Sequence, residues 1–163
     1  TAMVLELSNR MNESFAISIL EGKRAKYVAR DQKLRISSRL LRAGDSLPAH
    51  CSAPGKVLLA ALTLDELNNL LETDQPLEQC TEQSITDIAE LKECLRKVRL
   101  QSWGTAEDEF ELGMIAIAVP VFDQQGRVVA AMSVGSTKQR RTVDELREEF
   151  LPVLQDAAEK LSS

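Results

Sequence analysis

Residues 114–134 read MIAIAVPVFDQQGRVVAAMSV, and this stretch decides the fold. Two apolar arms flank the polar turn Asp123–Gly126, which is the pattern of a β-hairpin. Apolar residues recur with a period of two along each arm, and the residues between them are largely apolar as well. Strands that are apolar on both faces are buried on both sides. The sequence therefore predicts a hairpin at the centre of a sheet that is covered on both faces.

The residues before this hairpin predict a short helix followed by strands. Apolar side chains within residues 4–11 recur at helical spacing, so a short first helix is expected. From residue 15 the apolar positions alternate as far as a turn at residues 21–22, which predicts a second hairpin. A third strand is expected over residues 34–41, and residues 44–48 are expected to form a loop.

The middle and the end of the chain have helical periodicity. Short helices are expected over residues 56–62 and 64–72, and a third helix is expected after Asp87. The apolar stripe of residues 143–161 predicts a last helix, which Pro152 should kink or split. Strands grouped on either side of a block of helices indicate an α+β domain with a mostly antiparallel sheet.

Composition limits the class of protein. The chain has 163 residues, is 44% hydrophobic and 28% charged, and carries a formal charge of −5, which fits one globular domain. The negative charge disfavours nucleic-acid binding by this chain alone. Its apolar runs are too short for a membrane helix, and its N-terminus lacks a signal-peptide core. We therefore expect a cytoplasmic protein without membrane contact, and the chain can be a fragment of a longer one.

No group of residues forms a catalytic or metal-binding pattern. The three cysteines form no CxxC pair, so reduced thiols are expected. His50 is the only histidine, and no triad can be built around His50 and Cys51. No metal and no cofactor is expected.

A helix start is the remaining candidate for chemistry. The small residues Ala53, Pro54 and Gly55 precede a helix, where free backbone N–H groups attract anions such as a carboxylate. The alternative is that small residues only let this turn pack closely against the sheet. From the pattern alone we favour the packing interpretation.

Four segments in order resemble one family. Residues 47–60, LPAHCSAPGKVLLA, resemble the signature of the effector-binding domain of IclR-type bacterial transcriptional regulators. The acidic segment 107–113, the strand 117–123 with Gly126, and residues 130–134 fit the same family in the same order. The resemblance covers essentially the whole chain.

This resemblance implies a fold and partners. It implies a GAF/PAS-like domain whose central sheet has about five to six strands and helices on both sides. Residues 1–163 would form a single effector-binding domain, with an N-terminal winged helix-turn-helix absent from this chain. Operator DNA would be contacted only through that missing domain, a small organic acid would be the effector, and the protein would form a homodimer or tetramer.

The resemblance also implies a pocket. The residues that carry a ligand-binding role by matching position are Ile36, Ala53, Pro54, Gly55, Ala106, Glu107, Met114, Ala116, Ser133 and Gly135. Pro54 has no N–H, so the amides of Ala53 and Gly55 would have to hold a ligand carboxylate. Ala106 stands where a relative that senses small keto acids carries an aspartate, and a larger or aromatic carboxylate is therefore the preferred ligand.

Two other functions remain open at this stage. One is a thiol enzyme on the same fold, such as a free methionine sulfoxide reductase, with Cys51 as the reactive group. The other is a dimerisation module that binds no ligand.

Overall fold

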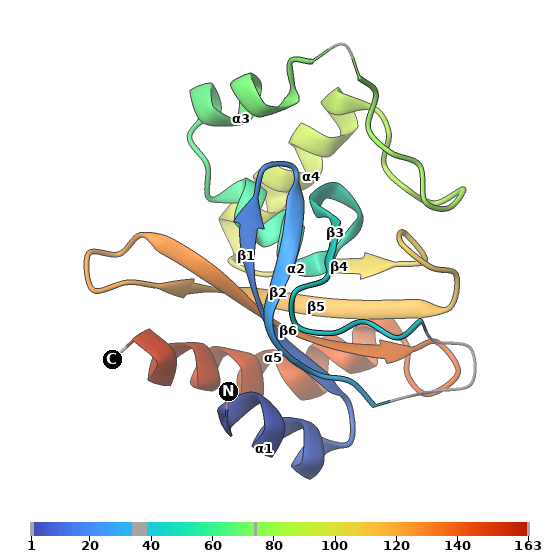
Figure 1. The fold of residues 1–163 in the computed structure, drawn as a ribbon, viewed down its shortest axis with the longest axis vertical. Coiled ribbons are helices and arrows are strands. Elements are labelled where there is room, and N and C mark those ends of the chain that lie inside the picture. The colour runs from blue at the N-terminus through green and yellow to red at the C-terminus, as the bar shows by residue number, and fades with distance from the viewer. Residues whose placement is uncertain (1, 34–38, 74, 163) are drawn as a thin grey trace.

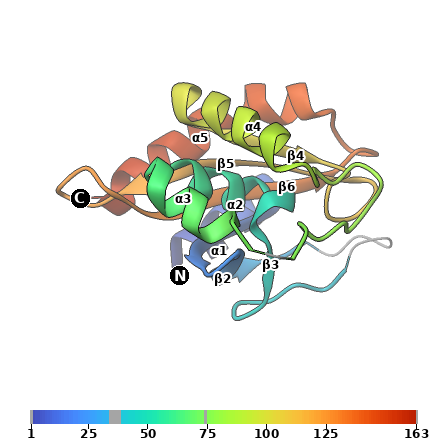
Figure 2. The ribbon, with the colours of Figure 1, turned by 90° about the horizontal axis from the view of Figure 1, so that it is seen from above.

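A curved six-stranded antiparallel sheet with helices on both faces forms the centre of the molecule (Figures 1 and 2). The structure is a computed structural model and describes residues 2–33, 39–73 and 75–162. The elements in chain order are α1 (Ala2–Met11), β1 (Ser14–Glu21), β2 (Arg24–Asp31), β3 (Ser46–Pro48), the short 3-10 helix η1 (Ala49–Cys51), α2 (Ala53–Ala60), α3 (Leu64–Leu71), α4 (Ile88–Gln101), β4 (Gly104–Glu107), β5 (Met114–Phe122), β6 (Val128–Thr137) and α5 (Val143–Ser162). The predicted α+β class is confirmed.

The hairpin predicted from residues 114–134 lies inside the sheet. The strand order is β3-β2-β1-β6-β5-β4, and every neighbouring pair is antiparallel. In the β5–β6 pair Ile117 lies opposite Val134, and in the β1–β6 pair Ala16 lies opposite Ser133. The N-terminal hairpin therefore joins the central one through β1 and β6.

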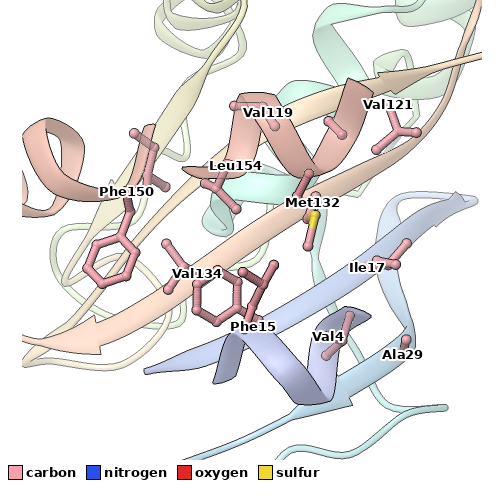
Figure 3. Close-up of a cluster of buried hydrophobic side chains, with 14 of the residues drawn as sticks. Val4, Phe15, Ile17, Ala29, Val119, Val121, Met132, Val134, Phe150 and Leu154 are labelled. Atoms are coloured by element: carbon pink, nitrogen blue, oxygen red, sulfur yellow. The ribbon is translucent and has the colours of Figure 1, made fainter. Parts of the chain in front are cut away.

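The two faces of the sheet carry side chains of different size. On the face covered by α1 and α5, large residues form a core that includes Phe15, Met132 and Leu154 (Figure 3). The rings of Phe15 and Phe150 meet edge to face there, with centroids 6.0 Å apart. The small buried residues on the opposite face pack with α2, α3 and α4; they are Ala106, Ala118 and Ala131. Small side chains on that face leave room for α2 to approach the sheet.

The third strand differs from the sequence prediction. Residues 34–38 lie outside the described residues, and residues 39–41 belong to no strand. The segment expected to be a loop instead forms β3, in which Ser46 pairs with Lys26 and Pro48 pairs with Arg24. Proline is tolerated there because β3 is an edge strand, where a missing N–H breaks no ladder bond.

One helix differs from its predicted limits, and another is not divided as predicted. Helix α2 begins at Ala53, because the Ser52 hydroxyl caps it by accepting the Gly55 N–H at 3.0 Å. Helix α5 is not split, because the buried residues Phe150 and Leu154 hold it to the sheet on both sides of the exposed Pro152. Within the described residues, no helix is long and apolar enough to cross a membrane.

Candidate ligand-binding pocket

A pocket opens on the small-residue face of the sheet, where β2, β5 and β6 meet the start of α2 and the loop after β4. Its lining residues are Tyr27, Arg30, Leu47, Cys51, Ser52, Ala53, Pro54, Ala106, Glu109, Phe110, Met114, Ile115, Ala116, Ser133 and Gly135. A second, more polar cleft adjoins it and shares Arg30, Met114 and Gly135. The two cavities are therefore neighbours on the surface of the molecule.

Seven of the ten residues that sequence reasoning assigned to a ligand site line this pocket: Ala53, Pro54, Ala106, Met114, Ala116, Ser133 and Gly135. Ile36 lies outside the described residues. The exposed Glu107 pairs instead with Lys138, at 3.2 Å between Nζ and Oε2, and does not line the pocket. The structure therefore brings together the predicted residues of α2, β4, β5 and β6.

Gly55 has a packing role. A Cβ atom at this position would lie 2.1 Å from the carbonyl oxygen of Ala49, so only glycine fits. Its N–H donates to Ser52 Oγ, and Pro54 has no N–H. The expectation that the Gly55 amide serves a ligand is therefore corrected, because the helix cap uses that amide. The packing interpretation of the small residues holds at Gly55, and only the Ala53 amide of the expected pair remains for a ligand.

Arg30 supplies the positive charge of the pocket. Within the described part of the chain it is the only cationic lining side chain, and no carboxylate lies within ion-pairing distance of it. Its guanidinium lies 4.5 Å from the ring centroid of Tyr27, and its Nε donates to the Leu41 carbonyl at 3.1 Å. Burial raises the pKa of the Tyr27 phenol, which is therefore neutral at neutral pH. No described residue accepts a hydrogen bond from the terminal amino groups of Arg30, so with respect to this part of the chain they can bind an anion.

Glu109 supplies the negative charge. Its Oε2 lies 2.6 Å from Nζ of Lys56, a side chain that is only 3% exposed and also donates to the Thr105 carbonyl at 2.8 Å. The other carboxylate oxygen, Oε1, is buried and has no hydrogen-bond partner among the described residues. An unsatisfied buried acceptor is costly, so this oxygen requires a donor.

The thiols beside the pocket are poor nucleophiles. Burial raises the pKa of Cys51, and burial together with the neighbouring Cys51 thiol raises the pKa of Cys80 to about 12. The imidazole of His50 bonds through Nε2 to the Glu78 carbonyl at 2.7 Å, so that nitrogen is not available to activate Cys51. A raised pKa keeps a thiol protonated, and the protonated thiol is the less reactive form.

The whole chain, residues 1–163, matches the family model described as "Bacterial transcriptional regulator IclR C-terminal". The chain belongs to the IclR family. Among curated IclR-family relatives it is 35% identical over 156 residues to the Pca regulon regulatory protein of Pseudomonas putida, covering 95% of this chain and 53% of that protein. It is also 36% identical over 135 residues to the p-hydroxybenzoate hydroxylase transcriptional activator of Acinetobacter baylyi, covering 83% of this chain and 49% of that protein. The chain thus spans about half the length of these relatives.

Solved structures of IclR-family domains share this fold. One is a double mutant of the inducer-binding domain of the PobR transcription factor from Acinetobacter, in complex with 3-hydroxybenzoic acid. It has a TM-score of 0.90 and 32% identity, and the match covers 99% of this chain and 94% of that one. Another is the C-terminal domain of the Escherichia coli regulator KdgR, with a TM-score of 0.85, 32% identity and coverage of 99% and 92%.

Proposed function

We propose that this chain is the effector-binding part of a longer IclR-family transcriptional regulator, and that its effector is a small organic carboxylate, with aromatic acids preferred. The observation that carries the proposal is the pocket, which combines apolar walls with Arg30, a cation that forms no ion pair with a carboxylate among the described residues. Ligand pockets are mostly apolar, with a few polar groups that fix the orientation of the ligand.

The walls of the pocket support the choice of an aromatic acid. Phe110 and Met114 offer flat or adaptable apolar contacts to a ring, and the small side chains of Ala106 and Ala116 leave space beside them. The relatives described above point the same way, since one is a p-hydroxybenzoate hydroxylase transcriptional activator and one solved structure is a complex with 3-hydroxybenzoic acid.

A route from the pocket to a DNA-binding domain runs through β2 and α1. Arg30 lines the pocket, and the next residue, Asp31, accepts a hydrogen bond on its carbonyl from Ser8 Oγ of α1 at 3.2 Å. A winged helix-turn-helix that precedes this chain would join it at α1. Effector binding would then shift the population between two arrangements of paired DNA-binding domains. The protein would act as a homodimer or tetramer and would not be an enzyme.

A thermal-shift titration tests the proposal. Benzoate, 3-hydroxybenzoate and 4-hydroxybenzoate are compared with pyruvate and other aliphatic acids, each from micromolar to millimolar concentration. A ligand at about 100 times its dissociation constant stabilises the native state by about 2.7 kcal/mol, which raises Tm by roughly 5–10 °C in a domain of this size. If no organic acid shifts Tm, the pocket is not an effector site and the dimerisation module is the better description.

A second assay addresses catalysis. The chain is incubated with free methionine sulfoxide and a thiol reductant, and we expect no formation of methionine. Turnover that disappears in Cys51→Ser would contradict the proposal and support a thiol enzyme.

A further inference from the structure

We infer that the pocket holds its effector in one direction, with a carboxylate on Arg30 and a hydrogen-bond-donating hydroxyl group on Glu109 Oε1. The effector class is then a hydroxy-substituted carboxylic acid. This inference rests on the proposed function, because it assigns the two ends of a ligand in the same pocket.

The position of Arg30 suits a carboxylate anchor. Arg30 belongs to both the apolar pocket and the polar cleft that adjoins it, so it lies where the two meet. The Tyr27 ring and the Leu41 carbonyl hold its guanidinium, which limits the side-chain freedom that a ligand would have to remove. A planar guanidinium with free terminal N–H groups matches the two oxygens of a carboxylate.

Glu109 selects for a different chemical group. Its Oε2 is neutralised by Lys56, whose ammonium group also bonds to Thr105, so this pair offers no net charge to an anion. A second carboxylate against Oε1 would be repelled, whereas a neutral hydroxyl group would satisfy the buried acceptor. Two further bonds fix the backbone of this loop, since Ser84 Oγ donates to the Glu109 carbonyl at 2.6 Å and Thr81 Oγ1 donates to the Asp108 carbonyl.

The two groups come from different elements of the fold. Arg30 is on β2 and Glu109 follows β4, and three strands separate β2 from β4 in the sheet order. The other lining residues are mostly apolar and include Pro54, Phe110 and Met114. A ligand with an apolar ring between its carboxylate and its hydroxyl group matches a pocket that offers one cation, one carboxylate oxygen and apolar walls.

Calorimetric titrations of the unaltered chain test the two contacts by changing the carboxylate or the hydroxyl group of the ligand. The probes are 3- and 4-hydroxybenzoate, the corresponding methoxybenzoates, which cannot donate a hydrogen bond, and the corresponding hydroxybenzamides, which carry no charge. We expect the better hydroxybenzoate to bind at least about tenfold more tightly than its methoxy and amide analogues. A methoxybenzoate that binds as tightly as its hydroxy counterpart would overturn the role of Glu109.

Substitutions of Arg30 and Glu109 test the same two contacts from the side of the protein. Arg30→Gln should weaken hydroxybenzoate binding about ten- to hundredfold and leave hydroxybenzamide binding unchanged. Arg24→Gln on the same strand is the matched control, because Arg24 bonds to Ser46 and does not line the pocket.

Glu109→Gln should reduce the preference for hydroxybenzoate over methoxybenzoate. The control is Glu93→Gln, which removes a surface carboxylate paired with Arg96 and should leave this preference unchanged.

The outcomes separate this inference from the proposed function. Hydroxybenzoate binding that is equal in Arg30→Gln and Arg24→Gln would overturn the carboxylate anchor and leave the sensor function intact. Failure of every organic acid, aromatic or aliphatic, to bind the unaltered chain would overturn both. If Glu109→Gln does not fold, the comparison of hydroxy and methoxy ligands on the unaltered chain still decides the role of Glu109.

Discussion

Glu13 is a buried carboxylate that ties three parts of the chain together. It is 1% exposed, and its oxygens lie 2.8 Å from Nε of Arg141 and 3.4 Å from Nε of Arg140. Ser136 Oγ on β6 also donates to it at 2.6 Å. The carboxylate therefore joins the start of β1, the end of β6 and the approach to α5 through bonds that are shielded from water.

Removing this charge should destabilise the fold. Glu13→Gln leaves two arginines facing a neutral group in a mostly buried place, and loss of one partner of such a pair costs about 3 kcal/mol. The control is Glu93→Gln on α4, whose pair with Arg96 is exposed and should cost well under about 1 kcal/mol. Urea unfolding measures both variants, and equal losses would show that the Glu13 network contributes no more than a surface pair.

Asp108 makes stability depend on pH. A hydrogen bond from Lys138, followed by one from the Gly113 N–H, holds the pKa of Asp108 below its usual range. A carboxyl group whose pKa is lower in the folded state binds fewer protons there than in the unfolded chain. Its contribution is therefore complete above the unfolded pKa of about 4 and is lost as pH falls through the folded pKa.

The matching variant is Asp108→Asn. It should be less stable than the unaltered chain at pH 7, and the difference should shrink as pH falls below about 4. Urea midpoints at pH 7, 5, 4 and 3 follow this difference. A gap that stays constant across this range would mean that ionisation of Asp108 does not stabilise the fold.

Helix α2 is the element on which the pocket depends, and its close approach to η1 is set by Gly55. Gly55→Ala would place a methyl group 2.1 Å from a backbone oxygen of Ala49, which cannot move without shifting η1. We expect a loss of at least about 1–3 kcal/mol of stability. Gly135→Ala is the control, because a Cβ there would lie 3.6 Å from the Ile115 carbonyl oxygen, an ordinary contact. Thermal unfolding of the two variants should differ clearly, and equal melting temperatures would contradict the packing role of Gly55.

The elements that sequence reasoning predicted are those with a local signal. The alternation in β5 and β6 and the capping box of α3, in which Thr63 and Glu66 bond to each other, need no distant partner to be recognised. Strand β3 has three residues and exists only because it pairs with β2, so its sequence alone read as a loop. Local periodicity cannot predict an edge strand that is defined only by its pairing with a distant strand.

The pocket also contains residues that local sequence motifs predict and residues that they do not. The predicted residues of α2, β5 and β6 lie on matched motifs, and they meet in the structure. Sequence reasoning placed the acidic segment at the pocket but named Glu107 there instead of Glu109, and it did not name Arg30, because a residue's place in the pocket lining depends on which partners surround it after folding. The available signal was the alternation of small residues at Ala116, Ala118 and Ser133, which distinguishes the pocket face of the sheet from its large-residue face.

At the scale of the whole molecule, exposed apolar side chains indicate where two copies could meet. The apolar stripe of α5 is buried on the sheet, whereas Leu5 of α1 is 51% exposed. We predict that the chain forms dimers at micromolar concentration and that Leu5→Glu shifts sedimentation toward monomer. Leu64→Glu on α3, which is 63% exposed, is the control and should sediment like the unaltered chain. Monomer at every concentration would contradict the prediction.

The charge of the whole molecule leads to the last prediction, which concerns DNA. The formal charge is −5, and the densest basic cluster, Lys138 with Arg140 and Arg141, is already paired with carboxylates. Lys138 bonds to Asp108 at 2.7 Å, and Arg141 also pairs with Glu149, so few cations remain to replace the counterions of a phosphate backbone. The chain alone should therefore show no sequence-specific duplex binding at physiological salt. A gel-shift titration with operator fragments and a scrambled duplex, repeated at several salt concentrations, measures this. Retardation of one operator that persists at physiological salt would contradict the prediction and show that this domain contacts DNA directly.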